Sequence, residues 1–212
     1  MGTVAVVDYG MGNLRSVAKA IEHVAPDARI IVTSLPRLVA QADRVVVPGQ
    51  GAMPDCMREL ETRGLRDTVA AAAAAKPFLG ICIGLQMLFE TSQEGGVAGL
   101  GILSGRVLRF PHERMVDRDG NRLKVPHMGW NQVRQTAAHP LWNAIPDDSR
   151  FYFVHSYFVD PVDRQSIAGV TDHGLPFTSA IAHANIFAVQ FHPEKSAHAG
   201  LKMLDNFMRW NP

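Results

Sequence analysis

The sequence predicts an α/β fold: a mostly parallel central sheet flanked by helices, with an additional antiparallel β extension. In the first half, short apolar runs rich in β-branched residues alternate with segments of helical periodicity, and parallel strands need such crossovers. In the second half, strand-like segments follow one another with only turns between them. We expect one domain over residues 1–212, because the chain shows no internal repeat and no linker rich in Pro, Gly or Ser.

The first half alternates strands and helices in a regular order. The segment Thr3–Val7 predicts a strand, which ends before the glycine turn at residues 10–13. Apolar residues then recur at helical spacing over residues 14–25, and Pro26 marks the end of that helix. The remaining elements expected here are strands at 28–32, 45–47 and 78–81, an alanine-rich helix at 65–75, and a helical pattern over 85–89. These strands are apolar throughout, which is typical of a sheet covered on both faces.

The second half predicts β-strands and one final helix. The expected strands are at residues 102–110, 130–133, 151–159, 167–172, 178–182 and 186–191. A helix is expected at residues 197–210, where Leu201, Leu204 and Phe207 share one face. The last strand and this helix resemble one more unit of the parallel sheet, so the antiparallel segments form an extension in the middle of the chain.

Composition and charge exclude several classes of function. The formal net charge is only +1, so no long-range field attracts the chain to nucleic acid or to an anionic membrane. The most apolar stretch, residues 68–89, is interrupted by Lys76, Pro77 and Gln86, and no targeting signal precedes the first strand. The only cysteines are Cys56 and Cys82, too few for a disulfide framework, so we expect a cytoplasmic protein.

The strongest local motif is Gly80-Ile81-Cys82-Ile83-Gly84, between an apolar strand and a helical pattern. It has the form of a nucleophile elbow. Its glycines permit a sharp turn that places the sulfur at the carboxyl edge of the sheet, where the next helix N-terminus favours negative charge. The alternative is a buried cysteine that only packs. Because Cys56 has no comparable setting, we expect it to be such a packing cysteine.

A cysteine nucleophile needs a base and a group that orients the base. His192 ends an apolar strand, and Glu194 follows two residues later. This spacing lets the carboxylate accept a hydrogen bond from one imidazole nitrogen and leaves the other nitrogen for a thiol. Taken alone, a histidine in this position is more often an ordinary surface or core residue.

Metal and cofactor sites are not expected. The nine histidines show no H-x-x-x-H or H-E-x-x-H spacing, and the two cysteines form no C-x-x-C pair. The loop at residues 10–13 resembles a dinucleotide fingerprint, but Arg15 stands where the third glycine belongs and no acidic residue ends the next strand. The sequence also lacks a P-loop and a G-x-S-x-G elbow.

Three motifs in one order resemble the class I (triad-type) glutamine amidotransferases. These are Pro48-Gly49-Gln50-Gly51, the elbow from Gly80 to Gln86, and His192-Pro193-Glu194. The resemblance runs from Val4 to about Ser196 and implies a single amidotransferase type 1 domain over residues 1–212. In the first motif, Gln50 occupies a position where the family commonly has an aliphatic residue. The backbone N–H of the loop is unaffected by that change.

Further segments are similar to one branch of this class, the glutaminase subunits of imidazole glycerol phosphate synthases in histidine biosynthesis. The elbow ends in Gly84-Leu85-Gln86, whereas related subunits for anthranilate, guanylate and carbamoyl phosphate synthesis typically carry Gly-His-Gln. The other segments that carry this similarity are residues 8–17, the sequence His127-Met128-Gly129-Trp130-Asn131, and residues 152–157.

The resemblance implies a role for each matching residue. Cys82 would attack the carboxamide of L-glutamine, with His192 as proton shuttle and Glu194 orienting His192. Ammonia would leave, and water would release glutamate from the Cys82 thioester. The implied oxyanion donors are backbone N–H groups of Gly49, Gln50, Gly51 and Ile83, and the implied glutamine contacts are Gln86, Ser156 and Tyr157.

The resemblance also implies a protein partner, because no feature of this chain would use the ammonia. That partner is a (β/α)₈-barrel cyclase, which makes imidazole glycerol phosphate and aminoimidazole carboxamide ribotide. The candidate docking residues are Asn13, Arg15 and Lys195, although an ordinary solvated surface is the alternative. Two other interpretations of the chain are a different cysteine hydrolase, which Gln86 and the P-G-x-G loop argue against, and a catalytically silent interaction protein.

Overall fold

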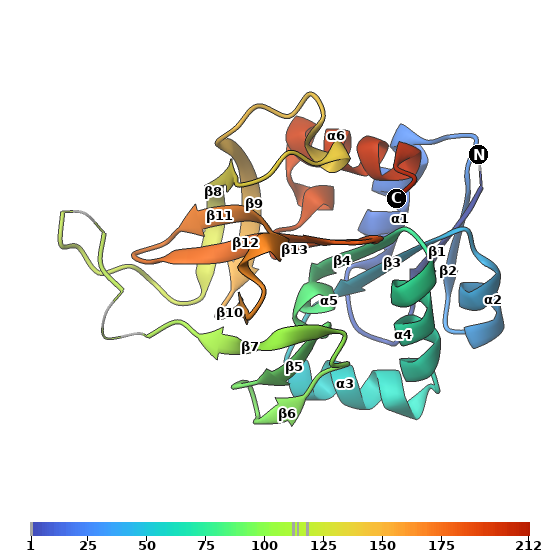
Figure 1. The fold of residues 1–212 in the computed structure, drawn as a ribbon, viewed down its shortest axis with the longest axis horizontal. Helices are drawn as coiled ribbons and strands as arrows, with labels where there is room; N and C mark the ends of the chain where they lie inside the picture. The colour runs from blue at the N-terminus through green and yellow to red at the C-terminus, as the bar shows by residue number, and fades with distance from the viewer. Residues whose placement is uncertain (1, 112, 114, 118) are drawn as a thin grey trace.

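A 13-stranded sheet forms the centre of the computed structural model, which describes residues 2–111, 113, 115–117 and 119–212 (Figure 1). The strands are β1 Thr3–Val7, β2 Arg29–Thr33, β3 Arg44–Gly49, β4 Phe78–Cys82, β5 Phe89–Ser92, β6 Val97–Ala98, β7 Leu103–Arg109, β8 His127–Gln135, β9 Ser149–His155, β10 Tyr157–Pro161, β11 Ile167–Asp172, β12 Pro176–His183 and β13 Ile186–Val189. Along the main path their order is β2-β1-β3-β4-β13-β12-β10-β7-β5-β6.

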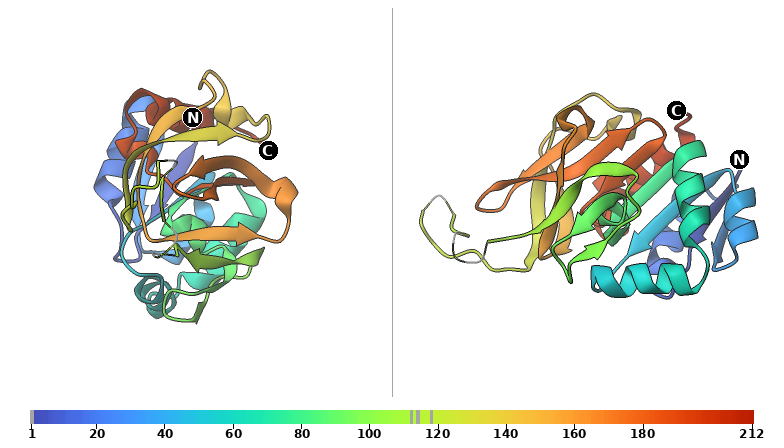
Figure 2. Two further views of the ribbon diagram at one scale, coloured as in Figure 1. Left: turned by 90° about the vertical axis from the view of Figure 1, so that its left-hand side faces the viewer. Right: turned by 60° about the horizontal axis from the view of Figure 1, so that its bottom comes forward.

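Helices cover the parallel part of this sheet. They are α1 Leu14–Val24, α2 Pro36–Gln41, α3 Met53–Thr62, α4 Arg66–Ala75, α5 Ile83–Gln86 and α6 Ala197–Arg209, with short 3₁₀ segments at η2 Pro140–Trp142, η3 Arg164–Ser166 and η4 Pro193–Lys195. Helices α1 and α6 pack together on one face, and α2, α3 and α4 lie on the other (Figures 1 and 2). Among the described residues, no helix is long and apolar enough to cross a membrane.

The parallel half consists of β2, β1, β3, β4 and β13. Strands β4 and β13 are buried along their whole length, because helices cover both faces of the sheet at this point. The register places Val189 of β13 beside Ile81 of β4. The carboxyl ends of these two strands therefore lie next to each other, although more than a hundred residues separate them in the chain.

The antiparallel extension continues the sheet beyond β13. Strand β12 pairs antiparallel with β13 and with β10, and β10 pairs antiparallel with β7. A branch runs from β12 through β11 and β8 to β9, and β9 contacts helix α6. Figure 2 shows this branch from two further sides. The predicted combination of a mostly parallel sheet with an antiparallel extension is confirmed.

Two sequence predictions were wrong in detail. The helical pattern at 85–89 is cut short, because the carbonyl of Leu88 accepts the N–H groups of Ile102 and Leu103 and the chain becomes strand β5 at Phe89. The strand expected at 151–159 is divided at Ser156, because β9 pairs with β8 whereas β10 pairs with β7 and β12. Helices α2 and α3 were not predicted, although each has a proline in its first turn.

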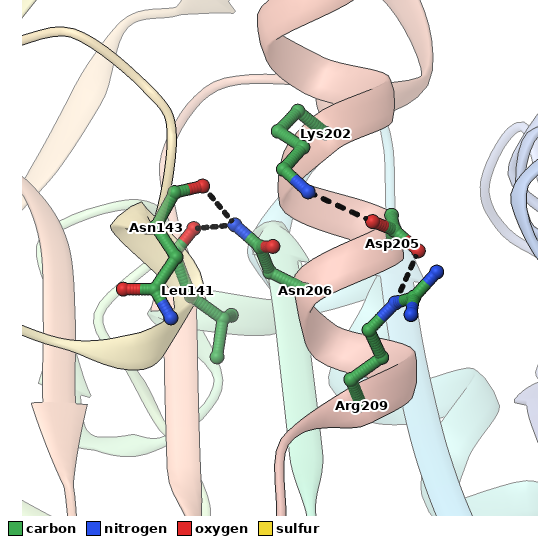
Figure 3. A network of polar contacts seen from close by, with 6 residues as sticks. All are labelled: Leu141, Asn143, Lys202, Asp205, Asn206 and Arg209. Carbon is green, nitrogen blue, oxygen red and sulfur yellow. Dashed lines mark hydrogen bonds and ion pairs between the residues drawn. The ribbon is translucent and has the colours of Figure 1, made fainter.

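A polar contact fixes α6 to the extension (Figure 3). The buried amide of Asn206 donates to the carbonyls of Leu141 and Asn143, at 3.0 and 2.7 Å. On the more exposed side of the helix, Asp205 forms ion pairs with Lys202 and Arg209. The Asn206 contact joins the last helix to the chain that precedes β9, so it holds together segments that the sequence separates widely.

Replacing Asn206 with Ala should lower the free energy of unfolding by about 1–3 kcal/mol, because two carbonyls at the joint lose their donor. Asp205→Asn is the matched control on the preceding residue, and it should cost less than about 1 kcal/mol because exposed ion pairs contribute little. Urea unfolding measures both variants. Equal losses would show that the joint contributes no more than the surface ion pairs.

Candidate active site

Cys82 ends β4 and caps α5 in a strained conformation. Its φ of 56° and ψ of −108° lie in a region that residues with a side chain rarely adopt. The chain reverses there from a buried strand into a helix, which holds the sulfur at the carboxyl edge of the parallel sheet. This is the geometry expected of a nucleophile elbow.

The two glycines of the elbow are required by close packing. A Cβ on Gly84 would lie 1.8 Å from the carbonyl oxygen of Val47, and one on Gly80 would lie 2.7 Å from the carbonyl oxygen of Gly84. No side chain fits at such distances, so α5 can approach β3 and β4 only with glycine at both positions. The G-x-C-x-G spacing therefore reflects the close approach of α5 to the sheet as well as the sharp turn at Cys82.

His192 and Glu194 lie beside Cys82 in the connection from β13 to α6. Nδ1 of His192 donates to Oε1 of Glu194 at 2.9 Å, and both side chains are almost fully buried. Nε2 of His192 makes no regular hydrogen bond within the described part of the chain, and the Cys82 thiol is the group it interacts with. The amide of Gln190 also lies 3.6 Å from the Cys82 sulfur. The structure thus brings the three predicted triad residues together.

The electrostatics of the site favour a protonated His192. Burial alone lowers the pKa of this imidazole, but its hydrogen bond and charge interaction with a Cys82 thiolate, together with those to the Glu194 carboxylate, outweigh burial and raise the pKa to about 9. The ring is consequently charged at neutral pH and has a proton to donate. A pair of thiolate and charged imidazole suits nucleophilic attack followed by protonation of a leaving amine.

Cys82 and His192 open into a cavity of ≈ 270 Å³. The predicted contact residues that line it are Gln50, Gly51, Ile83, Gln86, Ser156 and Tyr157. Gly49 lies at the end of β3, where a Cβ would meet the Tyr9 hydroxyl at 2.5 Å and the Ile83 Cβ at 2.6 Å. The parallel sheet supplies one wall of the cavity and the antiparallel extension supplies the other.

Gln86 links these two walls. Its amide Nε2 donates to the carbonyl of Tyr157 and to Oε1 of Gln190, both at 3.1 Å. Its Oε1 is buried and has no hydrogen-bond partner among the described residues. Since Gln190 also contacts Cys82, the elbow and strand β10 are connected through two amide side chains.

Glu94 is a cavity residue that the sequence analysis missed. Its carboxylate accepts the backbone N–H of Met53 at 2.8 Å, at the start of α3, and it also lines the cavity. Glu94 lies in a turn with Gly95 and Gly96 and belongs to none of the three motifs, so the sequence carried no signal for it. No group of three or more His, Cys, Asp or Glu side chains in the described ranges is arranged to hold a metal ion.

The family model of class I glutamine amidotransferases matches residues 5–210, nearly the whole chain. The chain belongs to this family. The enzyme class predicted from the three motifs, a glutamine amidotransferase, is confirmed. The resemblance to the imidazole glycerol phosphate synthase subunits is also confirmed, because relatives of high identity carry that name.

These relatives of the amidotransferase are named imidazole glycerol phosphate synthase subunit HisH. The protein of that name from Aromatoleum aromaticum is 70% identical over the full length of both chains. The one from Thiobacillus denitrificans is 66% identical over 99% of this chain and 92% of its own. Among solved structures, a putative GMP synthase component from Thermoplasma acidophilum has a TM-score of 0.72 at 18% identity, covering 99% of this chain and 93% of its own. PurLQS from Thermotoga maritima has a TM-score of 0.71 at 18% identity, covering 99% of each chain.

The second cysteine of this amidotransferase packs in the core. Cys56 is fully buried on α3, and burial raises the pKa of its thiol to about 12, so it stays protonated at neutral pH. Its sulfur donates to the carbonyl of Gln50 at 3.4 Å, from behind the P-G-x-G loop. Cys56 therefore supports the loop without facing the cavity as a nucleophile.

The three predicted docking residues lie at the carboxyl edge of the parallel sheet, as Cys82 does. Asn13 caps α1 and Arg15 is exposed in its first turn. Lys195 lies in η4, one residue after Glu194, with its Nζ 5.9 Å from the ring centre of Tyr152. Helix α1, which carries Arg15 and begins after Asn13, contacts η4, which carries Lys195.

Replacing Glu194 with Gln should lower the pKa of His192 by about one to three units, because an amide lacks the negative charge that favours the imidazolium. NMR titration of the His192 ring measures this change. Wild-type His192 has a pKa of about 9, above the unfolded value of 6.5. Its charge therefore contributes stability that is fully present below pH 6.5 and is lost as pH rises through about 9. The stability difference between the two proteins should shrink over that interval, and a constant difference would contradict this.

Proposed function

We propose that this amidotransferase is the glutaminase subunit of an imidazole glycerol phosphate synthase. One observation carries the catalytic part: Cys82 at a strained elbow, paired with the buried His192–Glu194 couple at the wall of a cavity. The relatives named HisH, 66–70% identical over almost the whole chain, support the choice of synthase. We also propose that residues 1–212 act as one cytoplasmic amidotransferase domain.

The proposed reaction begins when the Cys82 thiolate attacks the side-chain carboxamide of L-glutamine. His192 donates its proton to the departing nitrogen, and ammonia leaves a thioester on Cys82. His192 then accepts a proton from water, which attacks the thioester and releases glutamate. Glu194 holds the imidazole through Nδ1 and stabilises its charge. No step requires a cofactor, since protons and the acyl group are all that move.

Backbone N–H groups are the proposed donors to the tetrahedral oxyanion. Those of the Gly49–Gly51 loop and of Ile83 flank Cys82, because β3 and α5 converge at the elbow. Loss of one such donor typically costs about 10²–10³ in rate. The side chain of Gln50 does not replace this backbone N–H group. The backbone carbonyl of Gln50 accepts a hydrogen bond from the Cys56 thiol.

The cavity offers complementary groups for an amino-acid substrate. Glu94 supplies a negative charge for the α-ammonium of glutamine, and the side chain of Gln86 lines the same cavity. Ser156 and Tyr157 form the opposite wall, where they would contact the rest of the substrate. The cavity of ≈ 270 Å³ suits a small molecule of this class.

The ammonia is proposed to pass to a (β/α)₈-barrel cyclase. Free ammonia is protonated at neutral pH and diffuses away, so release into a partner avoids its loss. Asn13, Arg15 and Lys195 are the proposed docking residues, because they lie on the same edge of the sheet as Cys82.

Cys82→Ala should lower glutamine-dependent synthesis by at least about 10⁴-fold while the cyclase still uses added ammonium. Cys56→Ala is the matched control, because that thiol does not face the cavity, and it should retain glutamine-dependent activity within a few fold. Assays of the assembled complex with glutamine or ammonium measure both. A comparable loss in Cys56→Ala would identify the wrong nucleophile.

Glutamate release from glutamine should rise strongly when the cyclase and its nucleotide ligand are added to the purified chain. Lys195→Ala should weaken this stimulation without lowering the unfolding midpoint, since the residue is proposed to act at the docking face. Glutamate release that does not change when the cyclase is added would indicate that this amidotransferase serves another synthase. A complete lack of glutamate release would favour a silent interaction protein or another cysteine hydrolase.

A further inference from the structure

A chain of side-chain hydrogen bonds runs from the cavity wall to the surface of the extension. His155 Nδ1 lies 2.8 Å from the carbonyl oxygen of Tyr157, and His155 Nε2 lies 3.0 Å from His127 Nδ1. His127 Nε2 lies 3.1 Å from the amide nitrogen of Asn131, which also donates to the carbonyl of Asp172 at 2.8 Å. His127 and Asn131 belong to the sequence His127-Met128-Gly129-Trp130-Asn131, to which the proposed catalytic steps assign no role.

The backbone at the cavity end determines which nitrogen donates in each hydrogen bond of this series. A carbonyl oxygen only accepts hydrogen bonds, so His155 must carry its proton on Nδ1 to bond with Tyr157. A neutral His155 then has a lone pair on Nε2. His127 must therefore donate from its own Nδ1, and its Nε2 is left as an acceptor.

The backbone at the other end sets the same direction independently. Oδ1 of Asn131 accepts the N–H of Gln132 at 2.8 Å, and Nδ2 donates to the carbonyl of Asp172, so the amide has one possible orientation. Its second N–H hydrogen then points to Nε2 of His127. Both ends of the chain thus require the same Nδ1–H tautomer in the two histidines.

Burial keeps both rings neutral, as this arrangement requires. Burial is the largest cause that lowers the pKa of His127 to about 2 and that of His155 to about 3, and neighbouring His173 lowers both further. His173 stacks on His127 with ring centres 4.1 Å apart, and its Nε2 donates to the carbonyl of Lys124. The rings of His127 and His155 therefore stay neutral at physiological pH.

This series of hydrogen bonds ends at the break between β9 and β10, which lines the cavity. Ser156 is the single residue between β9 and β10, and the His155 side chain spans it to hold the carbonyl of Tyr157. The same carbonyl accepts the amide of Gln86 from the opposite wall. The shape of the break therefore depends on a donor at His155 Nδ1.

We propose that His127 and Asn131 are positioning residues that hold His155 in its Nδ1–H tautomer, and that this tautomer keeps Ser156 and Tyr157 in the geometry that binds glutamine. The proposal rests on the proposed function, because it assigns Ser156 and Tyr157 to the substrate. The histidine tautomers themselves are independent of any activity.

The first test is ¹⁵N NMR of the histidine side chains in the full wild-type chain. Protonated Nδ1 and unprotonated Nε2 are expected for both His127 and His155. Nε2–H tautomers in both rings would overturn the proposal whatever the activity. If these Nδ1–H tautomers are found but glutamate is never released, the proposed function fails while the histidine chain stands.

The second test compares two variants of nearly equal size at position 127. His127→Asn retains an N–H close to the position of Nδ1, whereas His127→Leu removes the donor to His155. We expect the KM for glutamine to rise at least about tenfold in His127→Leu, with kcat changed less than about threefold, and to stay within about threefold of wild type in His127→Asn. Equal KM values in the two variants would overturn the proposal.

Asn131→Asp tests the far end of the chain without altering either histidine. A carboxylate cannot donate to His127 Nε2, so the His127 tautomer should change in the ¹⁵N spectrum and the KM for glutamine should rise. Gln132→Glu adds the same charge at the next, exposed residue and should change neither quantity. An unchanged His127 tautomer in Asn131→Asp, or an equal rise of KM in both variants, would contradict the proposal.

Discussion

The close approach of α5 to strands β3 and β4 is the constraint on which the site depends. It requires glycine at positions 80 and 84, where any Cβ would collide with backbone, and it forces Cys82 into a positive φ. Such a conformation costs about 1–3 kcal/mol and persists only where the surroundings determine it. Here β4 is buried between β3 and β13, so the chain has no room to relax. The strained cysteine thus depends on the packing of the whole parallel sheet.

Sheet topology then supplies the partners of this cysteine. The antiparallel extension is inserted between β4 and β13, yet these two strands are parallel neighbours. The residues that follow β13 must therefore lie beside the residues that follow β4. This places Gln190 and His192 next to Cys82, and the short turn through Pro193 brings Glu194 back to the imidazole. The raised pKa of His192 follows from that proximity.

The extension contributes more than a cover for the sheet. Its strands change partners at Ser156, which opens the wall of the cavity opposite the elbow. Gln86 reaches across to this wall, in which His155 bonds to the carbonyl of Tyr157 and is itself held by His127. The proposed catalytic residues and the proposed glutamine contacts Ser156 and Tyr157 thus lie on different parts of one continuous sheet.

Local patterns were sufficient to predict the elbow and the alternation of strands and helices. The candidate triad also needed the three motifs in order, because His192 taken alone is more often an ordinary residue. The glycines around Cys82 and the spacing of His192 and Glu194 reflect turns of a few residues, so neighbouring sequence determines them. The shortness of α5, the break at Ser156 and the position of Glu94 were not predictable in this way. Each depends on hydrogen bonds to strands or loops far along the chain, and only the tertiary structure decides which of those distant segments become neighbours.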